Sequence, residues 1–288
     1  MSVPTQAFND SPPVVPRERM PLRRIVLWVV TVLVLIYLFV PIIVVVVFSF
    51  NAGRSLGVFT GFSFRWYTAL AHDDNVIASL KASLEVAVVT TVVGTLLGSM
   101  LAIGLGRMRS RLAGPANVLL LLPLVAPEIV TAIALLILFS ETGQSLSLTT
   151  VMLGHITFSI AYVTIIVRGR LALINPADEE AAMDLGSTNI GAILRVVVPA
   201  LRPAILGSAF IVFVLSFDDF VTSYFVSGNG VAPLPVVIYS LIRYGVTPEI
   251  NAIGTVMLAL TLVLMALALL VAGRAYRGLR NLIGEQHG

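Results

Sequence analysis

The sequence predicts an all-α integral membrane protein with six transmembrane helices. Of its 288 residues, 58% are hydrophobic and only 11% are charged, and the mean hydropathy is +0.99, well outside the balance of soluble domains. Six apolar runs are each long enough to cross a hydrocarbon core of about 30 Å. They lie near residues 25–50, 80–105, 115–140, 149–171, 203–226 and 251–272. An even number of spans places both termini on the same side of the membrane.

The distribution of basic residues predicts the orientation of these spans. Of the 18 Lys and Arg residues, all but four lie on the side of the two termini; the exceptions are Arg54, Arg65, Lys81 and Arg243. The positive-inside rule therefore predicts that both termini are cytoplasmic. Residues 1–24 are polar and rich in proline, which indicates a disordered tail, and residues 273–288 are expected to form a second tail. The first apolar run is longer than a signal-peptide core of about 7–15 residues, so we expect it to remain as a helix.

Local signals predict a short helix in the polar segment 175–199, on the cytoplasmic side between the fourth and fifth spans. Asn175 is suited to cap a helix whose first residue is Pro176. The three acidic residues at 178–180 complement the positive end of the helix dipole. Gly186 is expected to end the helix, because a left-handed backbone angle is commonly needed at that position.

A second short helix is expected to complete a helix–turn–helix that is too polar and too short to span the membrane. Ser187 or Thr188 can cap it, and Pro199 is expected to help end it. Small and apolar side chains on one side of the first helix would let another protein approach its backbone closely: Ala181, Ala182 and Leu185. The alternative is a solvated amphipathic loop without a partner.

The spacing within this segment resembles the cytoplasmic loop of binding-protein-dependent ABC importer permeases. That signature is E-A-A, three residues, G, nine residues and I-x-L-P. Here Glu180-Ala181-Ala182 precedes Gly186 at the same spacing, and Val196-Val197-Val198-Pro199 follows, with valine at both hydrophobic positions. The resemblance covers nearly the whole chain, and within the family the sequence is most similar in appearance to the spermidine/putrescine permease subfamily. Other stretches carrying it include 64-FRWY-67, 121-LLPLVAPEIVTAIALL-136, 215-LSFDDFVTSYFVSGNG-230 and 248-PEINAIGT-255.

This resemblance implies the type I importer permease fold and a role in a larger complex. The 175–199 loop would hold a coupling helix seated in a cleft of the ATPase. Its coupling residues would be Glu180, Ala181, Ala182, Asp184, Gly186 and Pro199. The implied partners are two ATPase subunits, a second permease chain that is expected to be a different polypeptide, and a soluble substrate-binding protein. The implied location is the bacterial inner membrane, where the chain would form half of an alternating-access pathway.

The chain itself is expected to carry no cofactor. A Walker A loop requires a lysine after a glycine, whereas the only lysine, Lys81, follows Leu80. ATP and magnesium are therefore expected in the partner ATPase, and this chain is expected to be a transport subunit rather than an enzyme.

Acidic residues inside predicted spans are costly and mark candidate substrate contacts. Glu128 lies roughly 20 Å along the third span from its cytoplasmic end, and Asp218 and Asp219 lie roughly 22–24 Å along the fifth. Carboxylates at one depth would attract a cation such as a polyamine, with nearby aromatic faces adding to its binding. The aromatic candidates are Phe217, Phe220 and Tyr224.

Two alternatives remain open for the aspartates, and in both of them the aspartates would not contact the substrate. Asp218 or Asp219 could cap a broken helix, or pair with Arg243 from the adjacent loop. Consecutive helical residues point about 100° apart, so both aspartates are not expected to face one lumen equally.

Composition and motifs exclude or disfavour other functions. Scattered basic residues disfavour nucleic-acid binding, and the absence of cysteine excludes disulfides and cysteine-ligated metals. His72, His155 and His287 lack metal-ligand spacing, and no hydrolase motif is present. Two alternatives stay open: an importer permease for another small solute, such as an amino-acid derivative, an opine or ferric ion, and a secondary cation transporter. The sequence does not separate putrescine from spermidine.

Overall fold

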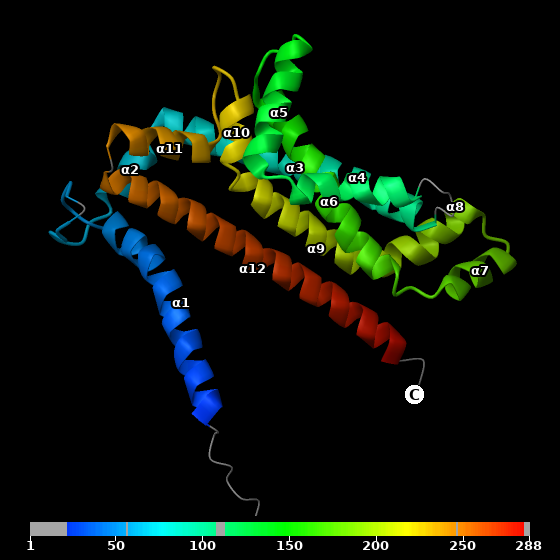
Figure 1. Cartoon of the computed structure of the whole chain (residues 1–288). Helices are drawn as coiled ribbons and strands as arrows, with labels where there is room; N and C mark the ends of the chain where they lie inside the picture. Colours follow the sequence, from blue (N-terminus) through cyan, green and yellow to red (C-terminus); the bar gives the residue numbers. More distant parts are fainter. Residues whose placement is uncertain (1–21, 56, 108–112, 246, 285–288) are drawn as a thin grey trace, which may run out of the picture.

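The computed structural model describes residues 22–55, 57–107, 113–245 and 247–284, and its described elements are helices joined by short loops (Figure 1). Five of its helical segments are long and apolar enough to cross a membrane. They belong to α1 (Leu22–Ser49), α3 (Asp74–Arg107), α6 (Leu148–Leu171), the segment Asn189–Phe217 that includes α9 (Val198–Phe217), and α12 (Pro248–Gly284). A bent pair, α4 (Ala113–Val125) and α5 (Glu128–Glu141), makes a sixth crossing if the two are counted as one span.

The third span is broken, whereas the sequence predicted one helix over 115–140. Helices α4 and α5 meet at an angle of 105°. Pro127 is the N-cap of α5, with extended backbone angles (φ −56°, ψ 130°). A proline lacks the N–H that a continuous helix needs and disfavours helical angles at the preceding residue, here Ala126. The break therefore falls at Pro127.

The fifth span differs from the expected 203–226 at both ends. Helix α8 (Asn189–Ala192) runs through a π-helical turn (Ile193–Val197) directly into α9. The prediction that Pro199 helps to end the second short helix is therefore wrong: Pro199 lies two residues after the π-helical turn, and the helix continues past it through α9. At the other end α9 stops at Phe217, and a separate short helix, α10 (Val221–Val226), follows.

Short helices close one end of the molecule. Helix α2 (Arg65–Leu70) lies in the connection after α1. Its Trp66 and Leu70 are buried. The Trp66 indole Nε1 donates to the Asn51 carbonyl at 2.8 Å. Helix α11 (Leu234–Tyr244) occupies the connection before α12, and the Leu234 backbone N–H donates to Ser83 Oγ of α3 at 2.8 Å.

The interior is built around α3, α6 and α9. One apolar cluster joins these helices through fully buried side chains: Ala102, Val163, Val167, Leu201 and Val212. Helix α7 (Pro176–Asp184) and α8 lie at the opposite end of the molecule from α2 and α11 (Figure 1). Helix α3 therefore runs between the two ends.

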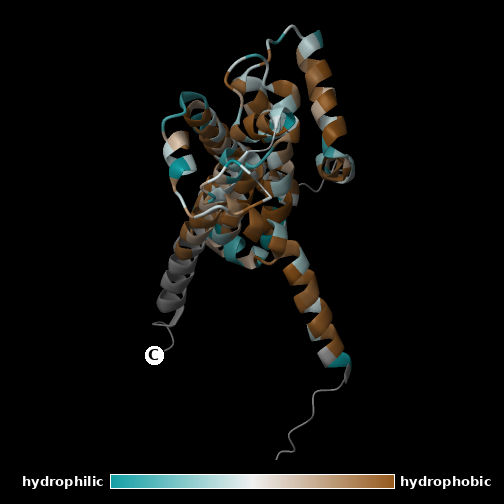
Figure 2. Cartoon of the chain, turned by 90° about the vertical axis from the view of Figure 1, so that its left-hand side faces the viewer, coloured by the Kyte–Doolittle hydropathy of each residue, from teal (hydrophilic) through white to brown (hydrophobic). Residues whose placement is uncertain are grey.

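Helices α1 and α12 diverge from each other below the interior (Figures 1 and 2). Helix α1 is apolar along almost its whole length, and its side chains are largely exposed (Figure 2). Residues 1–21 of the expected N-terminal tail lie outside the described residues. The expected C-terminal tail, 273–288, is instead helical as far as Gly284, because α12 continues through it.

Candidate functional site

The unwound step between α9 and α10 separates the two adjacent aspartates. Asp218 is the C-cap residue of α9, with φ −93° and ψ 0°, and its side chain is exposed. Asp219 is buried, with 7% of its surface exposed. The two carboxylates therefore have different environments, in keeping with the expectation that they would not face one lumen equally.

Asp219 is held by a buried polar cluster that includes a histidine from α6. Its Oδ2 lies 2.9 Å from His155 Nε2 and accepts from the Ser223 backbone N–H at 2.9 Å and from Ser223 Oγ at 3.1 Å. His155 is fully buried, and its Nδ1 lies 2.7 Å from Ser216 Oγ. A carboxylate only accepts hydrogen bonds, so Nε2 carries the proton that is donated to Asp219. This cluster ties α6, α9 and α10 together at the break.

Glu128 reaches the same place from the other broken span. It is the first residue of α5, its side chain is exposed, and its carboxyl group lies beside that of Asp219. The structure thus brings together two of the three carboxylates that the sequence placed at one depth. Helix capping, the first alternative for the aspartates, also applies to Asp219, because it accepts from Ser223 in the first turn of α10. Among the ion pairs of the described residues, none joins either aspartate to Arg243.

Three aromatic rings cluster next to these acidic residues. The ring centroids of Phe220 and Tyr239 are 4.7 Å apart, those of Phe220 and Tyr224 are 5.4 Å apart, and those of Tyr224 and Tyr239 are 5.5 Å apart. Tyr239 comes from α11 and was not predicted, because no local signal links that helix to α10. Phe217, by contrast, is 1% exposed and packs in an apolar core with residues of α2 and α12, so we no longer include it among the candidate substrate contacts.

The 175–199 segment folds locally as its capping signals predict. Asn175 Oδ1 accepts from the Ala177 N–H at 3.1 Å, Gly186 has φ +90°, and Thr188 Oγ1 accepts from the Gly191 N–H at 3.1 Å. The acidic, alanine-bearing side of α7 is open: Glu180, Ala181, Asp184 and Leu185 are exposed, and Ala182 is half-buried. This surface is accessible to another protein.

Glu179, one residue before the predicted coupling glutamate, turns toward the end of α3. It is buried and forms a two-pronged ion pair with Arg107, in the last turn of α3. A cavity of about 690 Å³ lies beside this pair, between α7 and the ends of α3 and α6. Arg168 of α6 also lines the cavity and donates to Asn117 of α4.

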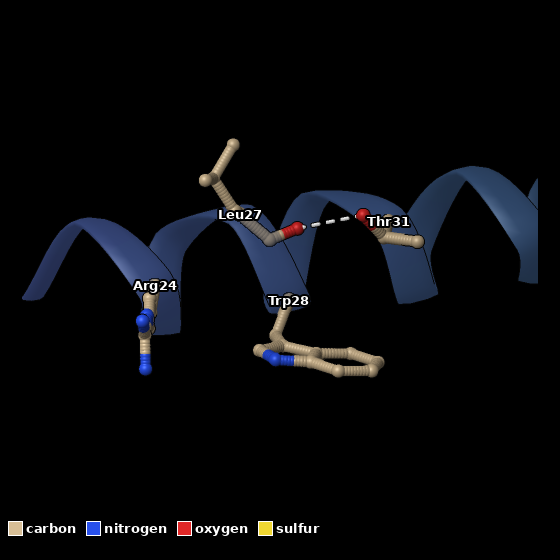
Figure 3. Close-up of a pocket in the computed structure, with 4 residues that line it drawn as sticks. All are labelled: Arg24, Leu27, Trp28 and Thr31. Carbon is tan, nitrogen blue, oxygen red and sulfur yellow. Dashed lines mark hydrogen bonds between the residues drawn. The ribbon is translucent and has the colours of Figure 1, made fainter. Parts of the chain in front are cut away.

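A further hollow lies on the first turns of α1 and is not a candidate site. Figure 3 shows its four lining residues, Arg24, Leu27, Trp28 and Thr31, which all belong to one helix. Thr31 Oγ1 donates to the Leu27 carbonyl at 2.8 Å, and the Trp28 ring is 64% exposed (Figure 3). An amphipathic ring beside an arginine at a helix end is typical of a membrane-interface anchor.

Comparison with known proteins identifies the family. Residues 94–281 match the model of the binding-protein-dependent transport system inner membrane component. The chain belongs to this permease family. It is 37% identical over 235 residues to the spermidine/putrescine transport system permease protein PotC of Haemophilus influenzae, covering 82% of this chain and 91% of that protein. It is 34% identical over 240 residues to the putrescine transport system permease protein PotI of Escherichia coli K12, covering 80% and 85%.

Solved ABC importers share the permease fold. A bacterial transporter that imports the polysaccharide alginate matches with a TM-score of 0.69 at 16% identity, over 88% of this chain and 96% of that one. The methionine transporter MetNI, in inward-facing conformations, matches with a TM-score of 0.62 at 14% identity, over 69% and 95%. The permease is therefore a multi-pass inner-membrane component with the type I importer fold, and it works with other ABC components as a transport subunit rather than as an enzyme.

Sequence reasoning missed the residues of the permease whose partners are remote in sequence. His155 lies 64 residues from Asp219, and Arg107 lies 72 residues from Glu179. A buried histidine in an apolar span was one available signal, since a polar side chain there needs a partner. The motif spacing emphasised Glu180 and gave no signal for the inward-facing Glu179.

Proposed function

We propose that this permease forms half of the translocation pathway of an ATP-driven importer for a polyamine, putrescine or spermidine. The observation that carries the proposal is that Glu128, at the break between α4 and α5, lies beside Asp219, in the unwound step after α9. The names of the relatives, which include spermidine/putrescine and putrescine permeases, support the same substrate class.

The chemistry of this site suits a compact organic cation. An ammonium group beside these two carboxyl groups would offset their negative charge and make charge-assisted hydrogen bonds with them. The faces of Phe220, Tyr224 and Tyr239 supply cation–π attraction to a further ammonium group. Transport requires release, so each contact is expected to be transient.

Coupling to ATP is assigned to the exposed side of α7. Glu180, Ala181, Ala182 and Asp184 would contact the ATPase, and Gly186 and Pro199 would shape the loop and its connection to α9. The complete importer would contain two ATPase subunits holding ATP and Mg²⁺, a second permease chain and a soluble substrate-binding protein. Alternating access would follow, with both termini of this chain in the cytoplasm.

Uptake of radiolabelled putrescine and spermidine by cells expressing the complete transporter tests the substrate assignment. Glu128→Gln and Asp219→Asn are each expected to lower uptake at least tenfold, because a charge-assisted hydrogen bond contributes about 1.5–3 kcal/mol. Glu141→Gln, at the exposed far end of α5, is the matched control and is expected to retain uptake. Retention of the ATPase in a pull-down shows that the variants assemble.

Two results would contradict the proposed function. If wild type carries neither polyamine, the substrate is another solute, such as an amino-acid derivative, an opine or ferric ion. If uptake persists without the ATPase, the chain is a secondary transporter. Glu180→Lys tests the coupling surface separately: it is expected to abolish ATPase association or substrate-stimulated hydrolysis, and a variant that keeps both removes Glu180 from the coupling surface.

A further inference from the structure

The ion pair between Arg107 and Glu179 connects the short helix α7 to α3, the longest of the three interior helices. Both guanidinium nitrogens Nη1 and Nη2 donate, one to each carboxylate oxygen of Glu179. The Glu179 side chain is 10% exposed and that of Arg107 is 33% exposed. A two-pronged guanidinium–carboxylate contact restricts both distance and direction, which a single hydrogen bond does not.

Helix α7 packs against α8 and the π-helical turn that leads into α9, but it has little packing of its own against α3. It contains nine residues, and a helix this short is marginal by itself. Apart from Glu179, no residue of α7 is buried. The cavity of about 690 Å³ between α7 and the ends of α3 and α6 shows that close packing does not connect them there. The ion pair crosses this incompletely packed region.

The direction of neighbouring side chains gives α7 two distinct sides. Successive residues of a helix point about 100° apart. Glu179 points to Arg107, whereas Glu180 is exposed and also lines the cavity beside the pair. Glu179, the residue before Glu180, thus gives α7 a direct side-chain link to α3.

Helix α3 continues from Arg107 to the polar cluster. It packs closely along α6, where Thr164 Oγ1 donates to the Gly98 carbonyl at 3.1 Å, and it also packs against α9. Helix α6 carries His155, and the segment after α9 carries Asp219. A displacement of α3 is thus passed to the elements that hold the carboxylate site.

We propose that Arg107 and Glu179 are positioning residues that transmit the movement of α7 to α3, so that ATP binding and hydrolysis by the ATPase change access to the carboxylate site. This proposal rests on the proposed function, since it assumes that α7 engages an ATPase. The pair itself contacts neither nucleotide nor transported cation. Its role depends on the complementary charges at the two positions and not on which residue carries which sign.

A charge-reversal cycle on the complete transporter tests this role. Arg107→Glu and Glu179→Arg each place like charges together, whereas the double reversal restores an ion pair. In proteoliposomes, each single variant is expected to bind the ATPase and hydrolyse ATP but to move at least tenfold less substrate per ATP. The double reversal is expected to return to within about threefold of wild type. Arg170→Glu, at an exposed arginine in the last turn of α6, is the control for charge alone.

A second measurement separates this proposal from the identity of the substrate. The chain has no cysteine, so Asp74→Cys and Glu141→Cys, at exposed ends of α3 and α5, can carry a spin-label pair. ATP with vanadate is expected to change the distance between the labels in wild type and in the double reversal, but not in either single reversal. This readout remains valid if wild type transports neither polyamine.

Several outcomes would overturn the proposal. Single reversals that keep both the transport ratio and the distance change show that the link is dispensable. A double reversal no better than the single variants shows that no complementary pair is needed. Single reversals that lose the ATPase altogether show that the pair holds α7 in its fold rather than transmitting movement. A wild-type transporter that shows no ATP-dependent distance change contradicts the ATP-driven function and this proposal together.

Discussion

Replacing Gly98 by alanine is expected to separate two helices of the interior. A Cβ added at this position would lie 2.6 Å from Val163 Cβ, 2.9 Å from Val163 Cγ1 and 3.0 Å from the Ile160 carbonyl oxygen. Gly94, one turn earlier, would bring a Cβ to 2.8 Å from Ser159 Cβ. Helices α3 and α6 therefore meet along a G-x-x-x-G stretch, where small residues let two membrane helices approach closely.

The size of the effect follows from these distances. Carbon atoms pack best at about 3.5–4.0 Å, so a contact of 2.6 Å is about 1 Å too short. Val163 is fully buried and its Cβ moves only with the backbone, so the helices must shift. Overpacking of this kind costs about 1–3 kcal/mol. Alanine also gains about 1 kcal/mol of helix propensity over glycine, which partly offsets the cost.

A second glycine of α3 isolates the packing contribution. A Cβ added at Gly104 has no atom within 4 Å outside its own helix, so Gly104→Ala gains the same propensity without a clash. The free energy of unfolding of Gly98→Ala is therefore expected to be about 1–3 kcal/mol lower than that of Gly104→Ala. Titration with a denaturing detergent, followed by fluorescence of Trp28 and Trp66, measures this difference. Equal stabilities within about 0.5 kcal/mol would refute the close approach of α3 and α6.

Two further variants test polar contacts. His155→Ala removes the hydrogen-bond donor to buried Asp219, so it is expected to destabilise the chain by about 1.5–3 kcal/mol and to lower polyamine uptake. His155→Gln can still donate and is expected to retain more of the stability and more of the uptake. Equal behaviour of the two variants contradicts the donor role. Asn51→Ala removes the side-chain hydrogen bonds between Asn51 and Ser55, Val58 and Thr60, so limited proteolysis is expected to cleave the following loop severalfold faster. The control Asn75→Ala, at an exposed residue, is expected to leave the cleavage rate unchanged. Equal cleavage rates for the two variants would show that Asn51 does not hold this loop.

Much of the fold could be predicted because its signals are local. The five continuous spans follow from apolar runs whose length matches a bilayer. The start and end of α7 follow from Asn175 and Gly186, whose roles depend only on neighbouring backbone groups. The wrong prediction for Pro199 shows the limit of such signals, because here the helix continues past the proline after a π-helical turn.

The carboxylate site could be predicted only in outline. Charged residues in apolar runs identified Glu128 and Asp219, since burial without a function is costly. Which of Asp218 and Asp219 lies beside Glu128 depended on the unwound step after Phe217, and no local sequence pattern predicts that step. The pairing of Glu179 with Arg107 depended on where α7 lies relative to the end of α3.

By itself, the sequence determined the membrane class, the approximate spans, the local shape of the 175–199 segment and the acidic residues of the candidate site. Each is a property of composition or of residues a few positions apart. Only the tertiary structure decided that His155 holds Asp219 and that Arg107 holds Glu179, across 64 and 72 residues of chain. The physical reason is that a buried charge needs a partner, but helix packing alone decides which distant residue supplies it.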